Sequence, residues 1–334
     1  MKLNNLQILR GISALLVCCF HFKDDLNFAD SEWGNVLFGK GSVGVPIFFV
    51  ISGYIMVYST KKFKNDEIKS NMISFIKKRV IRIIPLYYLL TLGWMILGGS
   101  VLLYFQDDYF SRLIHSILFL PQNQNFPVLF LGWSLNYEMF FYLIFAISLL
   151  FQKWRYFAIL LFFSTLILLG FLFSPENAFL KMITGFLNVY FLLGIVLGLS
   201  LDKIKVDERI LTVFSVLSIC IFILYLFNII SISNPFINTI PILLFVITFL
   251  IFDLFLKVKA NSFLKMTGDI SYSIYLCHPF VGILFTKFQT DSVLLSILLF
   301  LIKIVLVIFI SKVLYELVEK RFTQFLKEKW LPQY

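Results

Sequence analysis

The chain has 334 residues, of which 60% are hydrophobic and only 14% are charged, and its mean hydropathy is +0.90. No soluble domain of this size stays in solution with such a composition, so the sequence predicts a polytopic membrane protein. The formal net charge of +10 would suggest nucleic acid in a soluble chain, but here it reflects loop orientation, and we expect no nucleic-acid partner. The four cysteines lie inside apolar runs without metal-ligand spacing, which indicates buried side chains and no metal site.

Ten apolar stretches have roughly the length of about 20 residues that a helix needs to cross a bilayer. They cover residues 6–22, 43–60, 82–104, 132–151, 155–173, 183–200, 209–229, 236–256, 269–289 and 291–315. We therefore predict an all-α, polytopic bundle of about ten transmembrane helices in one membrane domain, residues 1–316. In residues 317–334, apolar and basic side chains alternate, which predicts a short amphipathic helix on the inner membrane surface.

Every second loop of this bundle is basic, with Lys61, Lys62, Lys64, Lys69, Lys77, Lys78, Arg79 and Arg82, then Lys153 and Arg155, then Lys203, Lys205 and Arg209, then Lys257, Lys259 and Lys265. The alternate loops are poor in basic residues and carry Asp24, Asp25, Asp30, Glu32, Asp107 and Asp108. Because cytoplasmic loops carry the basic excess, both termini are predicted to be cytoplasmic. We expect a multi-pass protein of the bacterial inner membrane, with residues 23–42 and 105–131 on the outer side.

The first predicted span contains Arg10 and ends near His21, two residues that a membrane helix does not need for its structure. Eleven residues make three helical turns and a remainder of ~20°, so both side chains point from one face, ~16 Å apart along the axis. Arg10 could instead extend its guanidinium to the cytoplasmic interface, and His21 could be an ordinary interfacial histidine. Asp24 and Asp25 could orient the His21 ring or remain solvated in the loop.

Glu138 lies about two turns into the fourth span, where a carboxylate needs a cation or a wet cavity. Trp133 and Tyr137 nearby are also consistent with interfacial anchors. His278 lies near the middle of the ninth span, directly before Pro279, which interrupts helical hydrogen bonding. A structural histidine at a kink and a functional histidine both fit that position.

The second span opens with a glycine-rich stretch that contains Gly41, Gly44 and Gly53, which favours close helix packing or space for a ligand. The Lys-Ser/Thr ending of a phosphate-binding P-loop is missing. Arg79 and Arg82 lie one helical turn apart on the cytoplasmic side. They either reflect only the excess of basic residues on the cytoplasmic side, or they bind phosphates as a pair.

Motifs from residue 6 to about residue 280 follow one another in a fixed order. They are Arg10-Gly11 with His21, residues 41–54, Arg79 to Pro85 with Tyr87, Trp133-Ser134-Leu135 with Glu138, Phe141 and Tyr142, and residues 268–278 with Ser271-Tyr272-Ser273, with a weaker match at Tyr315 to Glu319. Together they resemble the acyltransferase-3 family of integral membrane acyltransferases. The chain departs from that family at Ala146 and at Lys320-Arg321, where prolines are common, and both differences concern helix shape.

The resemblance implies about ten membrane helices and an enzyme that transfers acyl groups, mostly acetyl from acetyl-CoA, to hydroxyls of extracytoplasmic carbohydrates. It also implies that Arg10 and His21 are essential and that the histidine is catalytic. We expect acyl-CoA as the donor substrate, no metal, and a carbohydrate or lipid-linked glycan acceptor of the O-antigen, capsule or exopolysaccharide class. Membrane lipids are the other expected partners, and the oligomeric state stays open.

With this resemblance, Arg79 and Arg82 would bind the phosphates of acyl-CoA, and Arg10 would hold its arm near the cytoplasmic mouth. His21 would act as general base on the acceptor hydroxyl or carry the acyl group, since imidazole exchanges protons near neutral pH. Glu138 would orient His21 or stabilise its charge. The expected substrate contacts are Ser52, Tyr54, Trp133, Ser134 and His278.

A transporter or flippase for polysaccharide or lipid-linked sugar, or a partner in an export machine, would also place polar residues inside a helix bundle. Such transporters commonly consist of two related halves with paired broken helices. The sequence shows no such halves, and Arg10, His21 and Glu138 are all present. An enzyme is therefore the favoured interpretation.

Overall fold

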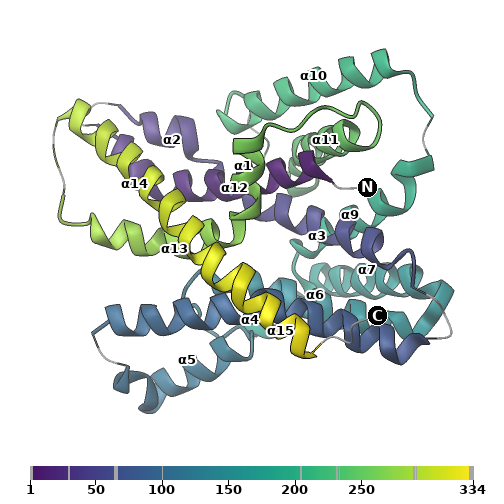
Figure 1. Ribbon diagram of the computed structural model, residues 1–334, viewed down its shortest axis with the longest axis horizontal. Helices are drawn as coiled ribbons and strands as arrows, with labels where there is room; N and C mark the ends of the chain where they lie inside the picture. The colour runs from purple at the N-terminus through teal and green to yellow at the C-terminus, as the bar shows by residue number, and fades with distance from the viewer. Residues whose placement is uncertain are drawn as a thin grey trace. The chain divides into compact units, whose positions relative to one another are not determined.

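The computed structural model of the chain is built from helices joined by turns (Figure 1). It describes residues 3–28, 31–63, 67–99, 101–203, 205–230, 232, 234–288, 290 and 292–330. Asp30, Lys64 and residues 331–334 of the predicted tail lie outside these ranges. Within them there is no β-strand, so the prediction of an all-α protein is confirmed.

A helix occupies most of each predicted span. These helices are α1 (Asn4–Phe22), α3 (Gly44–Thr60), α4 (Ile68–Leu97), α6 (Gly132–Ser148), α7 (Arg155–Phe173), α9 (Asn188–Ser200), α10 (Glu208–Leu226), α11 (Pro235–Leu254), α13 (Ser271–Leu284) and α14 (Val293–Leu314). The shorter helices are α2 (Trp33–Phe38), α5 (Asp107–Ile117), α8 (Ala178–Thr184), α12 (Ser262–Asp269) and α15 (Thr323–Trp330). A π-helical segment, Tyr315–Phe322, joins α14 to α15, so the tail is helical as far as it is described.

Eight segments of the described chain are long and apolar enough to cross a membrane. This number differs from the ten predicted spans because α6 and α7 count as one segment of 42 residues, and because α13 has only 14 residues. Gln152, with φ of 51°, interrupts the helical path between α6 and α7. The chain is a multi-pass membrane protein.

The third predicted span differs most from its helix. α4 begins at Ile68 and contains Pro85, so the basic residues Lys77 and Arg79 lie inside the helix and not before it. Lysine and arginine end an apolar run without ending a helix, because both are good helix formers. Arg79 and Arg82 therefore project from a continuous helix.

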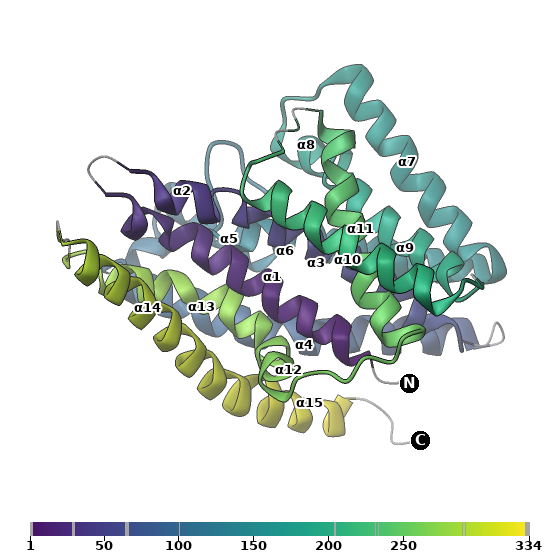
Figure 2. The same ribbon diagram turned by 90° about the horizontal axis from the view of Figure 1, so that it is seen from above.

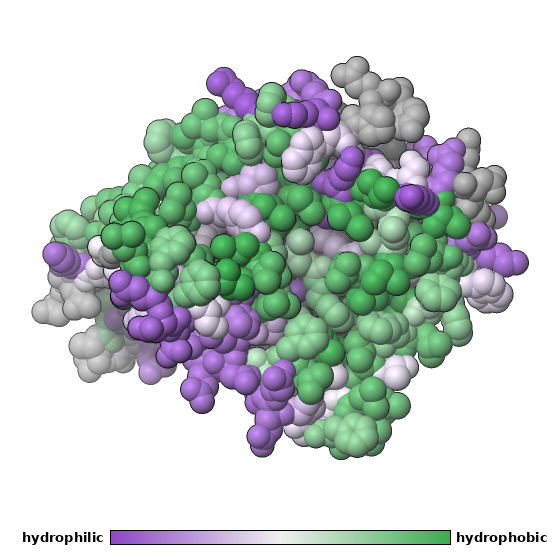
Figure 3. Space-filling model, turned by 90° about the horizontal axis from the view of Figure 1, so that it is seen from below, coloured by the Kyte–Doolittle hydropathy of each residue, from purple (hydrophilic) through white to green (hydrophobic). Residues whose placement is uncertain are grey.

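Apolar side chains cover much of the face that Figure 3 presents. Large hydrophobic residues are also exposed along α7 and α14, where Phe173 is 74% exposed and Leu294 is 79% exposed. In water such exposure would cost free energy in proportion to the apolar area, whereas lipid chains accept it. The surface therefore agrees with a membrane environment.

Contacts within the chain define two compact units. The first contains residues 1–51 and 196–315, and the second contains residues 52–195 and 316–334. In the first unit, α1 packs against α11, α12 and α13. Figure 2 shows α1 running beside α13. The two residues that the sequence singles out in the first span thus lie on a central helix of this unit.

A carboxylate from another helix caps the start of α1. Asp253 of α11 accepts hydrogen bonds from the backbone N–H groups of Asn5 (2.9 Å) and Leu6 (2.8 Å) and from the Asn5 side chain (3.1 Å). The first N–H groups of a helix need such acceptors, and the helix dipole favours a negative charge there. Because Asp253 is buried, this contact fixes the start of α1 against α11.

α1 and α12 approach each other closely at two glycines. A Cβ on Gly11 would lie 2.4 Å from Thr267 Oγ1 and 2.7 Å from Gly268 N, and a Cβ on Gly268 would lie 1.9 Å from Gln7 O. A side chain at either position would collide with backbone, so both positions require glycine. The close approach holds the helical turn that carries Arg10 against α12.

The second unit has an aromatic core. Phe141 of α6 stacks on Phe191 of α9 with 4.3 Å between ring centroids, and Phe145 stacks on Phe75 of α4 at 5.3 Å. Such ring pairs bury a large apolar area and prefer particular orientations. They hold α4, α6 and α9 together and so position the polar residue Glu138, one turn before Phe141.

Replacing Asp253 by alanine should lower the free energy of unfolding by about 2 kcal/mol or more, because it leaves buried helix N–H groups without an acceptor. Asp207→Ala is the matched control. Asp207 caps the exposed start of α10 and accepts one backbone hydrogen bond, from Arg209. Thermal unfolding of the protein in detergent measures both Tm values, and equal shifts would contradict the capping role of Asp253.

Candidate active site

His21 and His278 form a hydrogen-bonded pair in the first unit. His21 lies at the end of α1, and His278 lies in α13, which packs against α1. His21 Nδ1 is 3.2 Å from His278 Nε2, and the ring centroids are 4.9 Å apart. The His21 side chain is exposed, whereas His278 is fully buried. The pair therefore joins a reachable imidazole to one that is fixed in the core.

Backbone carbonyl groups determine which nitrogen of each ring carries the proton. His278 Nδ1 is 3.2 Å from the Ile274 carbonyl oxygen, which can only accept, so Nδ1 donates and Nε2 of neutral His278 is an acceptor. His21 Nδ1 then donates to His278 Nε2 and shares the same proton with the Val17 carbonyl oxygen at 2.9 Å. Neutral His21 consequently carries its lone pair on Nε2. A base oriented by a second group is typical of proton-transfer catalysis.

Arg10 lies toward the other end of the same helix, which is unbroken between Arg10 and His21 as the shared-face prediction requires. Arg10 Nη1 donates to Gln7 Oε1 at 3.1 Å, and Gln7 Nε2 donates to Asp269 Oδ1 at 3.1 Å. Gln7 therefore links the guanidinium of Arg10 to the end of α12.

Asp25 pairs with a lysine and not with His21. Its carboxylate oxygens accept from Lys303 Nζ of α14 at 2.7 and 2.6 Å. Neither alternative from the sequence, a partner for His21 or a solvated loop charge, is correct for Asp25. An ammonium group on an apolar helix needs a counter-ion, and Lys303, near the middle of the predicted span 291–315, is the sequence signal for such a pair.

Four polar residues meet in the second unit. Ser52 Oγ donates to Glu138 Oε1 at 3.2 Å, and the Tyr142 hydroxyl donates to the same oxygen. The Arg79 guanidinium lies over the Tyr142 ring, 5.3 Å from its centroid, and interacts electrostatically with Glu138. Within the described residues, the buried Nε of Arg79 has no hydrogen-bond partner. The structure thus brings together Ser52, Arg79 and Glu138, to which the sequence assigned separate roles.

The other predicted site residues are Arg82, Tyr54, Trp133 and Ser134. Arg82 is half-buried on α4, Tyr54 and Ser134 are buried, and Trp133 meets Tyr137 edge-on with 6.2 Å between centroids. Their substrate contacts stay predictions. In the part of the chain that is described, no group of three or more His, Cys, Asp or Glu side chains could hold a metal ion.

Comparison with known proteins shows that the sequence of the chain matches a protein family. Residues 3–316 match the family model described as an acyltransferase domain. The chain is 33% identical over 254 residues to "Exopolysaccharide production protein ExoZ" of Rhizobium meliloti (strain 1021), which covers 73% of this chain and 77% of that protein. It is 32% identical over 111 residues to "Putative peptidoglycan O-acetyltransferase YrhL" of Bacillus subtilis (strain 168), which covers 32% of this chain and 16% of that protein. No solved structure matches the chain.

The pair of Asp25 and Lys303 should respond asymmetrically to mutation, because the Lys303 side chain is 9% exposed and that of Asp25 is 26% exposed. Asp25→Ala leaves the more deeply buried charge unpaired, and we expect the free energy of unfolding to fall by about 3 kcal/mol. Lys303→Met supplies an apolar chain and leaves a carboxylate that can reach water, so its loss should be smaller.

Thermal unfolding in detergent of the two single variants and the double variant measures this response. The double variant should recover most of the stability that Asp25→Ala loses, since it removes both charges. Losses that simply add would show that the two side chains do not depend on each other.

Proposed function

The chain belongs to the acyltransferase family whose model it matches over residues 3–316, and from this premise we propose its donor, acceptor and catalytic base. The protein is a membrane O-acyltransferase. In our proposal it takes an acetyl group from cytoplasmic acetyl-CoA and transfers it to a carbohydrate hydroxyl on the outer side of the bacterial inner membrane. The names of the two relatives support this acceptor class, since one concerns exopolysaccharide production and the other names a peptidoglycan O-acetyltransferase.

The hydrogen bond between His21 and His278 is the observation that carries this proposal. His21 Nε2 takes the proton of the acceptor hydroxyl while the hydroxyl oxygen attacks the acetyl carbonyl carbon. The new C–O bond forms as the C–S bond of the thioester breaks. The proton held by His21 then neutralises the CoA thiolate, which returns His21 to its neutral form.

His278 acts in this proposal as a positioning residue. When His21 Nε2 gains a proton, His21 Nδ1 still donates to His278 Nε2 and to the Val17 carbonyl oxygen. Both acceptors stabilise the cationic ring and hold it in one orientation. The full burial of His278 favours this role over the substrate contact expected from the sequence.

Arg79, Arg82 and Arg10 bind the donor in this proposal. Arg79 and Arg82 follow the basic residues that the charge pattern assigns to the cytoplasm, where acyl-CoA is available. Guanidinium groups bind phosphate oxygens through paired, charge-assisted hydrogen bonds. The buried Nε of Arg79, which has no partner among the described residues, is one donor that a phosphate or carbonyl oxygen of the donor could satisfy.

Glu138 belongs to the donor side of this scheme. Ser52 and Tyr142 both donate to its carboxylate, which interacts electrostatically with Arg79. These contacts support a role in holding Arg79. They do not require Glu138 to orient His21, because His278 already accepts the Nδ1 proton of that ring.

His21→Ala should reduce acetyl transfer by about 10²-fold or more, since it removes the general base. Inside-out vesicles supplied with radiolabelled acetyl-CoA provide the measurement, as alkali-labile label on glycan. The variant must be present at the wild-type level. Unchanged labelling by His21→Ala would overturn the mechanism, and absence of label with the wild type would favour a transporter.

His278→Met should lower kcat by about 10²-fold with little change in KM, because methionine keeps the size of the side chain but offers only a weakly accepting sulfur. His278→Gln should restore much of that loss, since its side-chain carbonyl oxygen can accept the His21 Nδ1 proton. Steady-state kinetics of the two variants give the comparison. Equal losses in both would indicate a packing role for His278 alone.

A further inference from the structure

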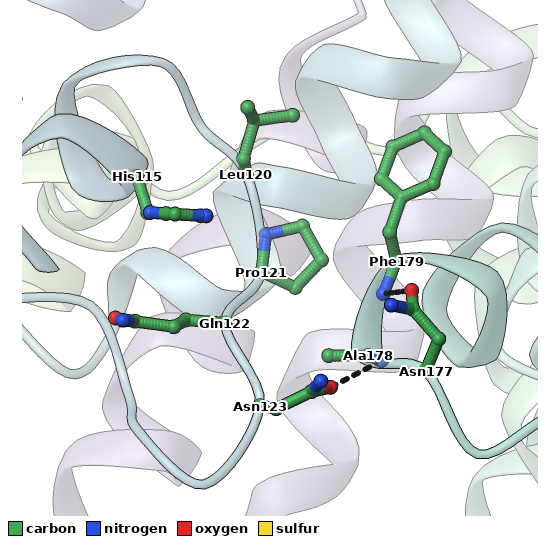
Figure 4. Close-up of a pocket in the computed structure, with 8 residues that line it drawn as sticks. All are labelled: His115, Leu120, Pro121, Gln122, Asn123, Asn177, Ala178 and Phe179. Atoms are coloured by element: carbon green, nitrogen blue, oxygen red, sulfur yellow. Dashed lines mark hydrogen bonds between the residues drawn. The ribbon is translucent and has the colours of Figure 1, made fainter. Parts of the chain in front are cut away.

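A pocket in the second unit has no part in the chemistry above, and we propose that it binds the carbohydrate acceptor (Figure 4). Its volume is about 390 Å³, and its lining includes His115, Pro121, Gln122, Asn123, Asn177 and Phe179. This volume lies within the range of small-molecule sites, about 300–1,000 Å³. The inference rests on the proposed function, because it names the place where the acceptor of that reaction binds.

The lining of this pocket is polar but uncharged. Its polar side chains are three carboxamides and one imidazole, and no lining residue is Asp, Glu, Lys or Arg. A phosphate or carboxylate ligand would find no cation there, so the pocket does not suit the nucleotide of acyl-CoA. Carboxamides both donate and accept hydrogen bonds, which matches hydroxyl groups that do the same. The chemistry favours an uncharged sugar.

Two asparagines form part of the pocket wall, and the side-chain amide of each has a nitrogen that can donate a hydrogen bond. Asn123 Oδ1 accepts from the Ala178 backbone N–H at 2.6 Å, and Asn177 Oδ1 accepts from the backbone N–H groups of Phe179 (2.9 Å) and Leu180 (3.2 Å). Figure 4 shows the bond from Asn123 that ties its loop to the start of α8. Since both oxygens are engaged, the orientation of each amide is set. Both asparagines are exposed, and their side-chain nitrogens are donors that can reach a ligand hydroxyl.

His115 and Gln122 provide acceptors. His115 Nδ1 is 2.8 Å from the Ser111 carbonyl oxygen, so Nδ1 donates and Nε2 of the neutral ring accepts. Gln122 Oε1 is buried without a hydrogen-bond partner in the described part of the chain. A buried carbonyl oxygen without a donor costs free energy, and a rotation of the Gln122 side chain toward the pocket would let a ligand hydroxyl recover it.

Phe179 gives the pocket an apolar surface beside these polar groups. Its side chain is 39% exposed, and its ring meets Phe140 of α6 edge-on at 6.3 Å, which fixes its orientation. Pro121 also lines the pocket. The C–H face of a sugar ring is apolar and packs against aromatic faces, while its hydroxyls point to the polar groups.

The two segments that line the pocket come from the same predicted side of the membrane. Residues 115–123 belong to the segment 105–131, which the charge pattern places outside. Residues 177–179 lie between the fifth and sixth predicted spans, and the alternation of loops places them outside as well. Extracytoplasmic glycans would be found on that side.

Acetyl transfer by the purified full-length protein with radiolabelled acetyl-CoA tests the proposal. One arm uses de-O-acetylated surface polysaccharide of the producing cells as acceptor, and the other uses their polyprenyl-linked glycan fraction. The variants are Gln122→Leu and Phe179→Ala. The matched control is Lys181→Gln, which alters a neighbouring cavity from the same helix, α8. Tm values show that each variant is folded.

Each pocket variant should raise the half-saturating acceptor concentration about tenfold, the effect of one hydrogen bond or one packing surface, and leave that for acetyl-CoA unchanged. The arm in which this occurs identifies the source of the sugar. Wild-type values for both acceptors, or equal changes for acetyl-CoA, would overturn the pocket assignment. Failure of the wild type to label either acceptor would instead overturn the proposed function, and the inference with it.

Discussion

The hydrogen bond from His21 Nδ1 to His278 Nε2 is the interaction on which the proposed chemistry depends. It requires α1 and α13 to lie close together, and other contacts fix the position of α1 against α11 and α12. Asp253 fixes the start of α1, and the contact at Gly11 and Gly268 fixes its middle. These contacts lie far from His21 along the helix, yet each of them helps to determine where the imidazole stands.

Two buried charges among the described residues, those of Asp253 and Lys303, have partners that help to hold helices together. Asp253 faces a helix N-terminus, and Lys303 faces Asp25. An unmatched charge would cost several kcal/mol in such surroundings. His21 differs from these groups because it is exposed and because its neutral ring, with Nδ1 donating to the Val17 carbonyl oxygen and to His278 Nε2, carries its lone pair on Nε2. A ring whose Nδ1 is held by acceptors and whose Nε2 has a lone pair suits a group that must take up and release a proton.

The helices could be predicted from sequence because apolar length alone determines where a chain crosses a membrane. The ends of α4 could not, since charged residues limit an apolar run without limiting a helix. The need of Arg10 and His21 for partners was also evident from their cost in an apolar segment. The partner of His21 was not, because His278 lies 257 residues from His21 in the sequence and only the packing of α1 on α13 brings them together.

The same limit applied to Asp25, whose partner lies 278 residues away, and to the pocket near His115, whose lining comes from residues 115–123 and 177–179. A sequence shows which group needs a partner, and the fold decides which residue supplies it. Glu138 is a second kind of example, in which the sequence suggested a partner and the structure shows other contacts. Its carboxylate was expected beside His21, yet the contacts observed within its own unit are to Ser52 and Tyr142.

The most direct test of the account is the position of the proton on His21. The chain has only three histidines, so ¹⁵N-histidine labelling of the protein in detergent gives a spectrum simple enough to assign, with His21→Ala identifying the His21 signals. At a pH where His21 is neutral, we predict a protonated Nδ1 and an unprotonated Nε2. A proton on Nε2 would contradict the hydrogen bond to His278 and, with it, the role of His21 as the base.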